Sequence, residues 1–253
     1  MEFVWMMAES NDAEWISRFN KRMMDYADDG ILRGAYGWRW ANPTTQISDT
    51  IALLRDSPDT RQAVLSMWDP TYDNAKARTS DRPCNTHIYL RIENERLNMT
   101  VCNRSNDLFW GMLGSNAVHM TMLHELISLA SGVQQGIYRV FTNNLHVYTE
   151  MPRFEEIYKK TFGAVDPYSF SHIRHTPLLD RNETFEQFQD DCRRLVDNDK
   201  HESMQTHWME NVALPMYDAY LDREYRNEHI KNIDAQDWHL VCHQWVTRRA
   251  GSD

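Results

Sequence analysis

Two β-rich stretches joined by a short polar connection constrain the fold of this chain more than any other feature. Residues 86–92 carry β-branched and aromatic side chains, Glu93-Asn94-Glu95-Arg96 can form a hairpin connection, and residues 97–102 provide the returning strand. Further strands are predicted at 63–68, 136–140 and 144–148, and helices at 2–9, 46–55 and 115–129. The sequence therefore predicts one α+β domain over residues 1–253, with a mixed sheet in the middle and helices at both ends.

Local signals predict where some of the flanking elements begin. Asn11 or Asp12 can cap the second helix. The apolar side chains predicted to share its buried face are Trp15, Ile16, Phe19, Met23 and Tyr26. Residues 34–40 predict a loop punctuated by glycines, and residues 69–83 predict a polar loop.

Residues 150–253 are predicted to be rich in helix. Thr184 with Gln187 forms a possible capping box, Pro215 is expected to break or kink a helical stretch, and Asp237 can cap the last helix. The predicted buried faces comprise Phe185, Phe188, Cys192 and Leu195 on one helix, and Trp238, Val241, Cys242 and Trp245 on the other.

The composition argues against several classes of function. A net charge of −10 is unlike a general nucleic-acid-binding protein, which usually presents a basic face. The sequence shows no apolar run of membrane-spanning length and no typical secretory signal, so no membrane association is expected. Four cysteines without CxxC spacing favour a reduced, cytoplasmic compartment. No HExxH motif joins His119, His124 and Glu125, so no metal site is predicted.

The residues best suited to chemistry flank the predicted hairpin. Arg82-Pro83-Cys84-Asn85-Thr86 places a thiol in a turn before the first strand. Asn103-Arg104-Ser105-Asn106-Asp107 places an arginine, a serine and a carboxylate after the second strand, and Asn116 opens a predicted helix. Such groups can attack an electron-poor carbon, hold a phosphate and read a polar ring.

Taken together, these motifs resemble the thymidylate synthase and pyrimidine hydroxymethylase family, and especially its homologues carried by bacterial viruses. The similarity covers roughly residues 2–150. Each motif alone is weak, but all of them occur in the family's order and at near-family spacing. The matching residues are Glu2, Trp5, Tyr36, Gly37, Trp40, Thr60, Arg61, Trp68, Pro83, Cys84, Arg104, Ser105, Asp107, Gly111, Asn116, His146 and Tyr148. The resemblance implies a thymidylate synthase-like mixed, twisted sheet with flanking helices.

The resemblance implies that Cys84 is a covalent nucleophile. Its thiolate would add to C6 of a pyrimidine ring, so that C5 can accept a one-carbon unit from 5,10-methylenetetrahydrofolate. Arg104 is the cation expected to lower the pKa of this thiol. Read without the resemblance, Cys84 would be interpreted as a buried structural cysteine.

Two arginines and a serine are implied to bind the nucleotide's phosphate. Arg104 and Ser105 match phosphate contacts within one subunit, and an arginine fork suits phosphate oxygens. Arg61 matches an arginine that the family donates across a homodimer interface, although a solvated surface charge is the alternative interpretation. Gln62 replaces the next family arginine, which leaves the phosphate site one charge poorer. The family segment with a further phosphate-binding arginine is absent before Glu2, which implies either a misassigned start or a shortened protein with a weaker phosphate site.

Asn116 matches the residue that reads the base. A side-chain amide can donate to the 4-oxo group and accept from the ring N–H, which favours deoxyuridylate (dUMP). Cytosine-specific relatives have an aspartate there, so a deoxycytidylate (dCMP) hydroxymethylase is an alternative. A gapless alignment would place Ser115 at this position instead. An asparagine can also act simply as a helix cap.

The remaining matches concern the sugar, the folate and proton transfer. His146 and Tyr148 match the pair that hydrogen-bonds the sugar hydroxyl, and ordinary packing on a strand face is the alternative. Asp107 matches the carboxylate that holds the folate ring. Glu2 and Tyr36 match an acid–base pair acting through ordered water.

Two departures from the methylating members bear on the product. Met23 or Met24 falls where those members place a tryptophan, and residues 247–253 do not resemble their apolar closing tail. A site less sealed from water favours hydroxymethylation over methylation. The sequence thus predicts a one-carbon transferase that forms 5-hydroxymethyl-dUMP. The alternatives are a thymidylate synthase, a dCMP hydroxymethylase and an inactive nucleotide-binding paralogue.

Overall fold

The computed structural model describes residues 1–74, 81–150, 173–198 and 203–250. Its strands are β1 (Val64–Ser66), β2 (Asn85–Glu93), β3 (Arg96–Asn103), β4 (Asn106–Asp107), β5 (Gln134–Thr142) and β6 (Leu145–His146). The longer helices are α1 (Glu2–Met7), α3 (Tyr36–Ala41), α4 (Gln46–Asp56), α6 (Ser115–Ala130), α8 (Phe185–Val196), α9 (Leu214–Leu221), α10 (Arg226–Lys231) and α11 (Gln236–Ala250). The other helical elements are α2 (Ala13–Ser17), η1 (Lys21–Tyr26), α5 (Pro70–Asp73), η2 (Leu108–Met112) and η4 (Met209–Ala213).

The mixed sheet expected from the sequence is present. Its strand order is β1-β2-β3-β5, with two antiparallel pairs and a parallel β3–β5 pair. The β2–β3 hairpin turns at Asn94 and Glu95, whose positive φ values of 51° and 59° suit a two-residue connection between twisted strands. Parallel β3 and β5 require a crossover, and α6 supplies it. The strand predicted at 144–148 is only β6, and it pairs with β4 in a separate two-stranded sheet.

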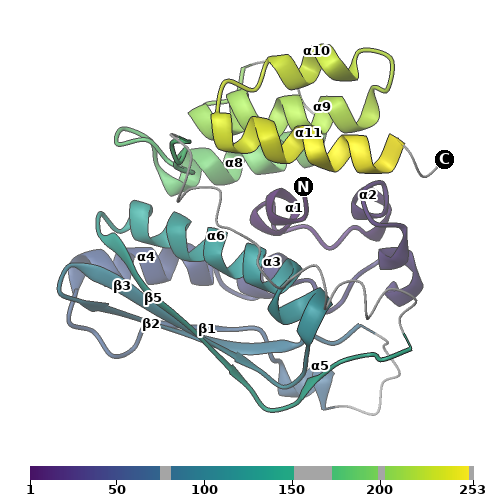
Figure 1. Cartoon of the computed structure of the whole chain (residues 1–253). Coiled ribbons are helices and arrows are strands. Elements are labelled where there is room, and N and C mark those ends of the chain that lie inside the picture. Colours follow the sequence, from purple (N-terminus) through teal and green to yellow (C-terminus); the bar gives the residue numbers. More distant parts are fainter. Residues whose placement is uncertain (75–80, 151–172, 199–202, 251–253) are drawn as a thin grey trace.

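Helices cover one face of the four-stranded sheet. Figure 1 shows α3, α4 and α6 on this face, then α1 and α2, and beyond them the C-terminal helices α8 to α11. Alternation along β2 explains the arrangement, because Ile88 and Leu90 are buried whereas Tyr89 between them is 49% exposed. Ile137 and Phe141 of β5 are likewise exposed. One face of the sheet therefore belongs to the core, and the other presents apolar side chains.

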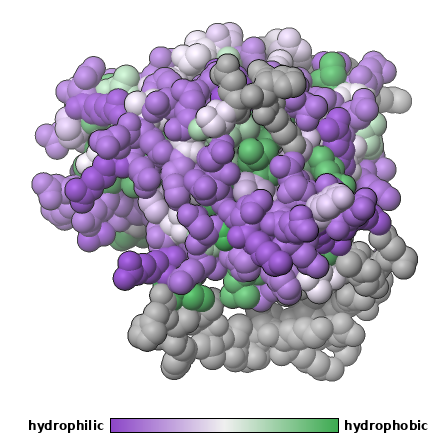
Figure 2. All heavy atoms as spheres, turned by 90° about the horizontal axis from the view of Figure 1, so that it is seen from above, coloured by the Kyte–Doolittle hydropathy of each residue, from purple (hydrophilic) through white to green (hydrophobic). Residues whose placement is uncertain are grey.

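The two ends of the chain pack into the same core. Phe19 lies after α2, and its ring centroid is 4.8 Å from that of Tyr220 on α9. Tyr220 in turn stacks on Trp245 of α11 at 4.7 Å. Seen from the side of the C-terminal helices, the surface is mostly hydrophilic, with apolar atoms in small separate groups (Figure 2). In the described part of the chain, no helix is both long and apolar enough to cross a membrane.

Two predictions near the N-terminus are wrong. The loop expected over 34–40 contains α3, because Gly37 serves close packing instead of a turn: a Cβ there would lie 1.8 Å from the Met6 carbonyl oxygen. The helix expected to continue to Tyr26 ends at Ser17, although Asp12 caps it as predicted. Asn20 then accepts a hydrogen bond from the Arg22 backbone and begins the separate element η1.

The expected capping box of α8 is confirmed. Thr184 Oγ1 accepts from the Gln187 backbone at 3.2 Å, and the Gln187 side chain accepts from the Thr184 backbone at 2.9 Å. Pro215 does not break its helical stretch, which continues from the π-helical η4 into α9. The hydrogen-bond pattern changes from π to α just before the proline, which has no backbone N–H to donate.

Predictions for the last helix and for the segment after β1 need correction. Asp237 lies inside α11 instead of capping it, and its carboxylate accepts hydrogen bonds from the Thr176 backbone and hydroxyl. Val241, predicted on the buried face of that helix, is 49% exposed. The polar loop expected over 69–83 contains the short α5, which begins at a proline after the capping Asp69.

Candidate active site

Cys84 and Arg104 meet at one end of the β2–β3 hairpin. Antiparallel pairing places the residue before β2 beside the residue after β3, and the Arg104 backbone N–H donates to the Cys84 carbonyl at 2.9 Å. The guanidinium folds back over the same turn, donating to the carbonyls of Pro83 at 2.9 Å and Arg82 at 3.0 Å. Its Nη2 lies 4.0 Å from the Cys84 sulfur. A thiol and a cation are thus held together by backbone geometry.

Burial dominates the ionisation of Cys84. Loss of hydration raises the pKa of the half-buried thiol, the Arg104 charge opposes this rise, and Asp81 adds to it. The sequence prediction that Arg104 lowers this pKa is correct for that single interaction, but the net shift is upward. The cause is that the Pro83–Cys84 turn packs into the protein, which the local sequence does not reveal.

Tyr36 lies close to this turn. The backbone N–H of Asn85, the residue after the thiol, faces the Tyr36 hydroxyl and acts to lower its pKa. Burial raises the pKa of Tyr36 well above its ordinary value, and the neighbouring Cys84 acts in the same direction. Tyr36 therefore remains a protonated hydroxyl at neutral pH.

Glu2 reaches the same region from α1. Its carboxylate lies 3.6 Å from His119 Nε2, and His119 is buried on α6 whereas Glu2 is half-buried. Burial lowers the pKa of His119, which the Glu2 charge opposes. Gly37 allows α1 to approach α3 closely, which brings Glu2 and Tyr36 onto neighbouring helices.

Asn116 is oriented by a second amide. Its Nδ2 donates to Oδ1 of buried Asn106 at 3.1 Å. This bond leaves the Asn116 oxygen and its second N–H directed elsewhere. Gly111 makes room for the pair, since a Cβ there would lie 2.0 Å from Asn106 Oδ1 and 3.1 Å from Asn116 Nδ2.

Asp107 and His146 face each other across the small sheet. They are register partners of β4 and β6, and the His146 ring contacts the exposed Tyr148 edge-on at 5.1 Å between centroids. Asp107 Oδ1 accepts from the backbones of Phe109 and Trp110. Its Oδ2 is buried and has no hydrogen-bond partner in the described part of the chain. A ligand N–H could satisfy that oxygen.

Arg61 is the predicted site residue that the fold keeps apart. Ser105 adjoins Arg104 and is half-buried, but exposed Arg61 precedes β1 at the end of the sheet far from Cys84. About seven residues of β2 lie between the position of Cys84 and the position that Arg61 faces. At about 3.3 Å per residue, this is a separation of roughly 20 Å. Within one subunit, Arg61 therefore does not reach the Cys84–Arg104 turn.

Sequence reasoning missed three residues that shape this region: Asp81, Asn106 and His119. Asp81 anchors the turn before Cys84 by accepting the Gly34 backbone N–H at 2.7 Å. Asn106 belongs to the segment 103–107. Its position between Ser105 and Asp107, both predicted site residues, could have indicated that it lies in the site. His119 was considered only as a metal ligand, and nothing local indicates its proximity to Glu2.

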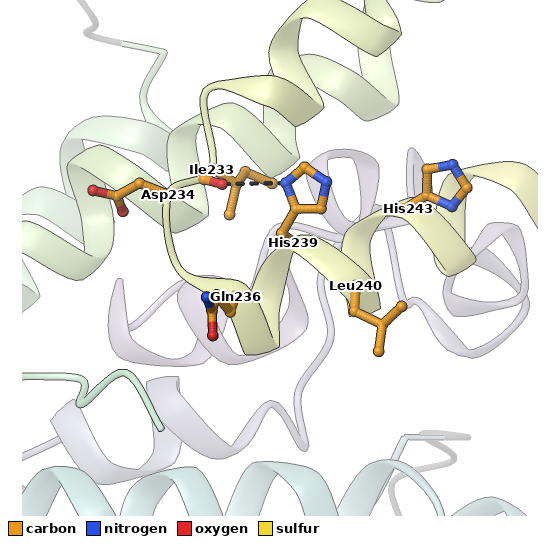
Figure 3. Close-up of a pocket in the computed structure, with 6 residues that line it drawn as sticks. All are labelled: Ile233, Asp234, Gln236, His239, Leu240 and His243. Carbon is orange, nitrogen blue, oxygen red and sulfur yellow. Dashed lines mark hydrogen bonds between the residues drawn. The ribbon is translucent and has the colours of Figure 1, made fainter. Parts of the chain in front are cut away.

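Two adjoining hollows lie elsewhere, against the C-terminal helices. The smaller one encloses about 410 Å³ between α10 and α11, and Figure 3 shows His239 and His243 projecting from α11 beside it. His239 Nδ1 donates to the Ile233 carbonyl at 3.2 Å. The larger hollow, of about 770 Å³, shares Asp234 and Gln236 with the first. No predicted site residue lines either hollow, and the described residues contain no cluster of metal-ligating side chains.

Comparison with known proteins decides the family. The model of the family "Thymidylate synthase" matches residues 1–230. The chain belongs to the thymidylate synthase family. A deoxyuridylate hydroxymethyltransferase of Pseudomonas phage M6 is 34% identical over 98% of this chain and 76% of its own length. Thymidylate synthase A from Bacillus subtilis shares the fold, with a TM-score of 0.58 and 19% identity over 75% of this chain and 67% of the other.

Two further relatives match over shorter regions. Deoxyuridylate hydroxymethyltransferases of Bacillus phage SP01 and Delftia phage PhiW-14 are each 36% identical, over 64% and 58% of this chain. This chain spans less than half of their lengths, at 46% and 44%. The family and these homologues are one-carbon transferases, and the family uses methylenetetrahydrofolate as co-substrate.

Proposed function

We propose that this chain transfers a one-carbon unit from 5,10-methylenetetrahydrofolate to C5 of dUMP and forms 5-hydroxymethyl-dUMP. The observation that carries the proposal is the Cys84–Arg104 turn, in a chain 34% identical over nearly its whole length to a phage deoxyuridylate hydroxymethyltransferase. The overall reaction consumes dUMP, methylenetetrahydrofolate and water, and it releases tetrahydrofolate.

Cys84 is the proposed nucleophile. Its thiolate adds to C6 of the uracil ring, and the electron pair of the C5–C6 bond moves so that C5 can attack the methylene carbon. The folate supplies that carbon. After C5 loses its proton and tetrahydrofolate leaves, water adds to the exocyclic methylene and the Cys84 sulfur departs from C6. Arg104 and Ser105 are proposed to hold the phosphate, which would also release Arg104 from its carbonyl contacts.

Asn116 is the proposed reader of the base. Its bond to Asn106 fixes the amide so that the free oxygen can accept from the uracil N3–H and the second N–H can donate to O4. Cytosine presents the opposite pattern, an acceptor at N3 and a donor at C4. Asn116 is therefore proposed to favour dUMP over dCMP. His146 and Tyr148 are proposed to contact the sugar hydroxyl.

Proton transfer is assigned to Tyr36 and Glu2. Tyr36 remains protonated and adjoins the nucleophile's turn, which suits a group that exchanges a proton at the ring through water. Glu2 pairs with buried His119, whose lowered pKa favours a neutral imidazole beside the carboxylate. Asp107 is proposed to satisfy its unpaired Oδ2 with an N–H of the folate ring.

Hydroxymethylation requires water at the exocyclic methylene. Met24, at or next to the position where methylating members place a tryptophan, is 45% exposed, and its neighbour Met23 is only half-buried. The neighbouring surface is thus open to solvent, which supports a hydroxymethyl product. Phage relatives also support an enzyme that acts in the cytoplasm of a host cell.

A homodimer is proposed to complete the site. The uncovered sheet face carries the exposed apolar side chains of Val64, Tyr89, Ile137 and Phe141, a surface suited to burial against a second copy. Arg61 lies at the end of the sheet remote from its own Cys84. Serving the partner's phosphate would explain that placement.

Mass spectrometry of the product tests the reaction. The protein is incubated with methylenetetrahydrofolate and either dUMP or dCMP, and tritium release from [5-³H]dUMP is followed in parallel. We expect 5-hydroxymethyl-dUMP and tetrahydrofolate, with tritium release lost in Cys84→Ser and retained in Cys102→Ser, a half-buried thiol on the same hairpin. Thymidylate with dihydrofolate would identify a thymidylate synthase. Absence of tritium release from the folded wild type would support an inactive paralogue.

A further inference from the structure

The Arg22 side chain lies over the Trp110 ring at the edge of the proposed active site. Arg22 belongs to η1 and Trp110 to η2, and the guanidinium carbon is 4.4 Å from the ring centroid. This distance is within the range of a cation–π contact. Arg22 is exposed and Trp110 is 39% exposed, so both remain accessible to a ligand.

Trp110 is fixed relative to Asp107. Its backbone N–H donates to Asp107 Oδ1 at 2.5 Å, within the cap that begins η2. The other oxygen of Asp107 is the buried, unpaired Oδ2. The carboxylate proposed for the folate ring and the guanidinium of Arg22 therefore contact the same residue, one at the Trp110 backbone and the other at its ring.

The charge of Arg22 has no carboxylate to neutralise it in the described part of the chain. The salt bridges found there involve other cations. The whole chain carries a net charge of −10, so a cation without an acidic partner is conspicuous beside this site. A guanidinium that contacts an aromatic ring through its carbon still has N–H groups that can bind a carboxylate bidentately.

We propose that Arg22, supported by Trp110, binds a carboxylate of the glutamate tail of the folate co-substrate. The inference rests on the proposed function, which supplies the folate. In a folate, an aminobenzoyl group separates the ring system from the glutamate carboxylates. Trp110 lies between the two proposed contacts in the same order, with Asp107 bound at its backbone and Arg22 over its ring. The same pair links η1 to η2.

The test compares ligands with and without the glutamate. Tetrahydrofolate and tetrahydropteroate share the ring and aminobenzoyl groups, but only the former carries the tail. Their binding to the full chain, with dUMP present, is followed by tryptophan fluorescence for wild type, Arg22→Ala and Arg22→Lys. Steady-state turnover is measured with the methylene form of each. Lys21→Ala is the matched control, because it removes one exposed positive charge from the same element.

We expect Arg22→Ala to weaken tetrahydrofolate binding about tenfold, the loss of one charged hydrogen bond. The KM for methylenetetrahydrofolate should rise in parallel, while kcat and the KM for dUMP stay near wild type. Tetrahydropteroate binding should be unchanged in Arg22→Ala. Arg22→Lys should lose less than Arg22→Ala, and Lys21→Ala should match wild type.

Equal weakening of both ligands in Arg22→Ala would overturn the proposal and give Arg22 a purely structural role. Unchanged binding of both would overturn it as well. Arg22-dependent binding of tetrahydrofolate without turnover of any nucleotide would support this subsite and refute the proposed reaction. A wild type that binds neither ligand would refute both.

Discussion

At the scale of single residues, burial and charge act against each other on Cys84. Burial raises the pKa of the thiol more than the adjacent Arg104 lowers it. A raised pKa means a smaller thiolate fraction at neutral pH, so reactivity should increase as the pH rises toward that pKa. The Arg104 guanidinium limits the rise in the pKa of Cys84. Arg104 therefore matters for the ionisation of the thiol even before any phosphate is bound.

Removing Arg104 should move the titration of Cys84 to higher pH. In Arg104→Gln the opposing charge is lost, so the midpoint of the pH-dependent alkylation rate by iodoacetamide should shift upward. Peptide mass spectrometry separates Cys84 from the other thiols. Arg91→Gln, at an exposed arginine paired with Glu93 on the same strand, should leave the midpoint in place. A downward shift in Arg104→Gln would contradict the assigned electrostatics.

Asn116→Asp should change the base preference. A carboxylate cannot donate to O4 of uracil and would face Asn106 Oδ1, so kcat/KM for dUMP should fall about 10- to 100-fold. Turnover of dCMP should increase, as measured by product mass spectrometry with each nucleotide. Ser115→Asp is the control for the gapless alignment. If Ser115→Asp changes the preference and Asn116→Asp does not, the assignment of Asn116 is wrong.

At the scale of elements, close packing of α1 on α3 positions the residues proposed for proton transfer. Gly37 faces the backbone of Met6, and this contact sets Glu2 relative to Tyr36. The relative placement of α1 and α3 therefore depends on Gly37, which has no side chain to hold them apart.

Gly37→Ala should destabilise the protein and impair catalysis together. The added Cβ would lie 1.8 Å from the Met6 carbonyl oxygen, so α1 and α3 must separate. We expect a loss of about 3 kcal/mol in the free energy of unfolding, typical of overpacking, measured by urea denaturation. Gly30→Ala is the comparison: its φ of +79° is strained for alanine, but no atom lies within 4 Å. An equal or smaller loss in Gly37→Ala would argue against tight packing of α1 on α3.

At the scale of the whole molecule, the uncovered sheet face and the position of Arg61 point to the same assembly. The face bears apolar side chains, and Arg61 lies beyond reach of its own Cys84. In a two-fold dimer, a residue at the edge of this face can approach the partner's site.

Mixing two inactive variants should restore activity. If the proposed assembly forms, Cys84→Ser lacks the proposed nucleophile and Arg61→Ala lacks the proposed trans phosphate contact, so a mixed dimer contains one complete site. After subunit exchange, tritium release should recover to about a quarter of the wild-type rate, because half of the dimers carry one good site of two. Sedimentation confirms the oligomeric state of each sample. Recovery would not occur if Arg61 served its own subunit, and Arg61→Ala would be active by itself if Arg61 were only a surface charge.

The sequence by itself determined the features that depend on a few neighbouring residues. The hairpin connection at 93–96, the cap at Asp12 and the capping box of Thr184 with Gln187 follow from local hydrogen bonds and turn geometry, and the structure has all three. The family could also be predicted, because its motifs keep their order along the chain.

Only the tertiary structure decided how those motifs come together. It made residues 36–41 a helix because Gly37 meets the backbone of Met6. It brought Glu2 to His119, fixed Asn116 through Asn106, and raised the pKa of Cys84 despite Arg104. Burial and packing join residues that are distant in sequence, so no local pattern could show them.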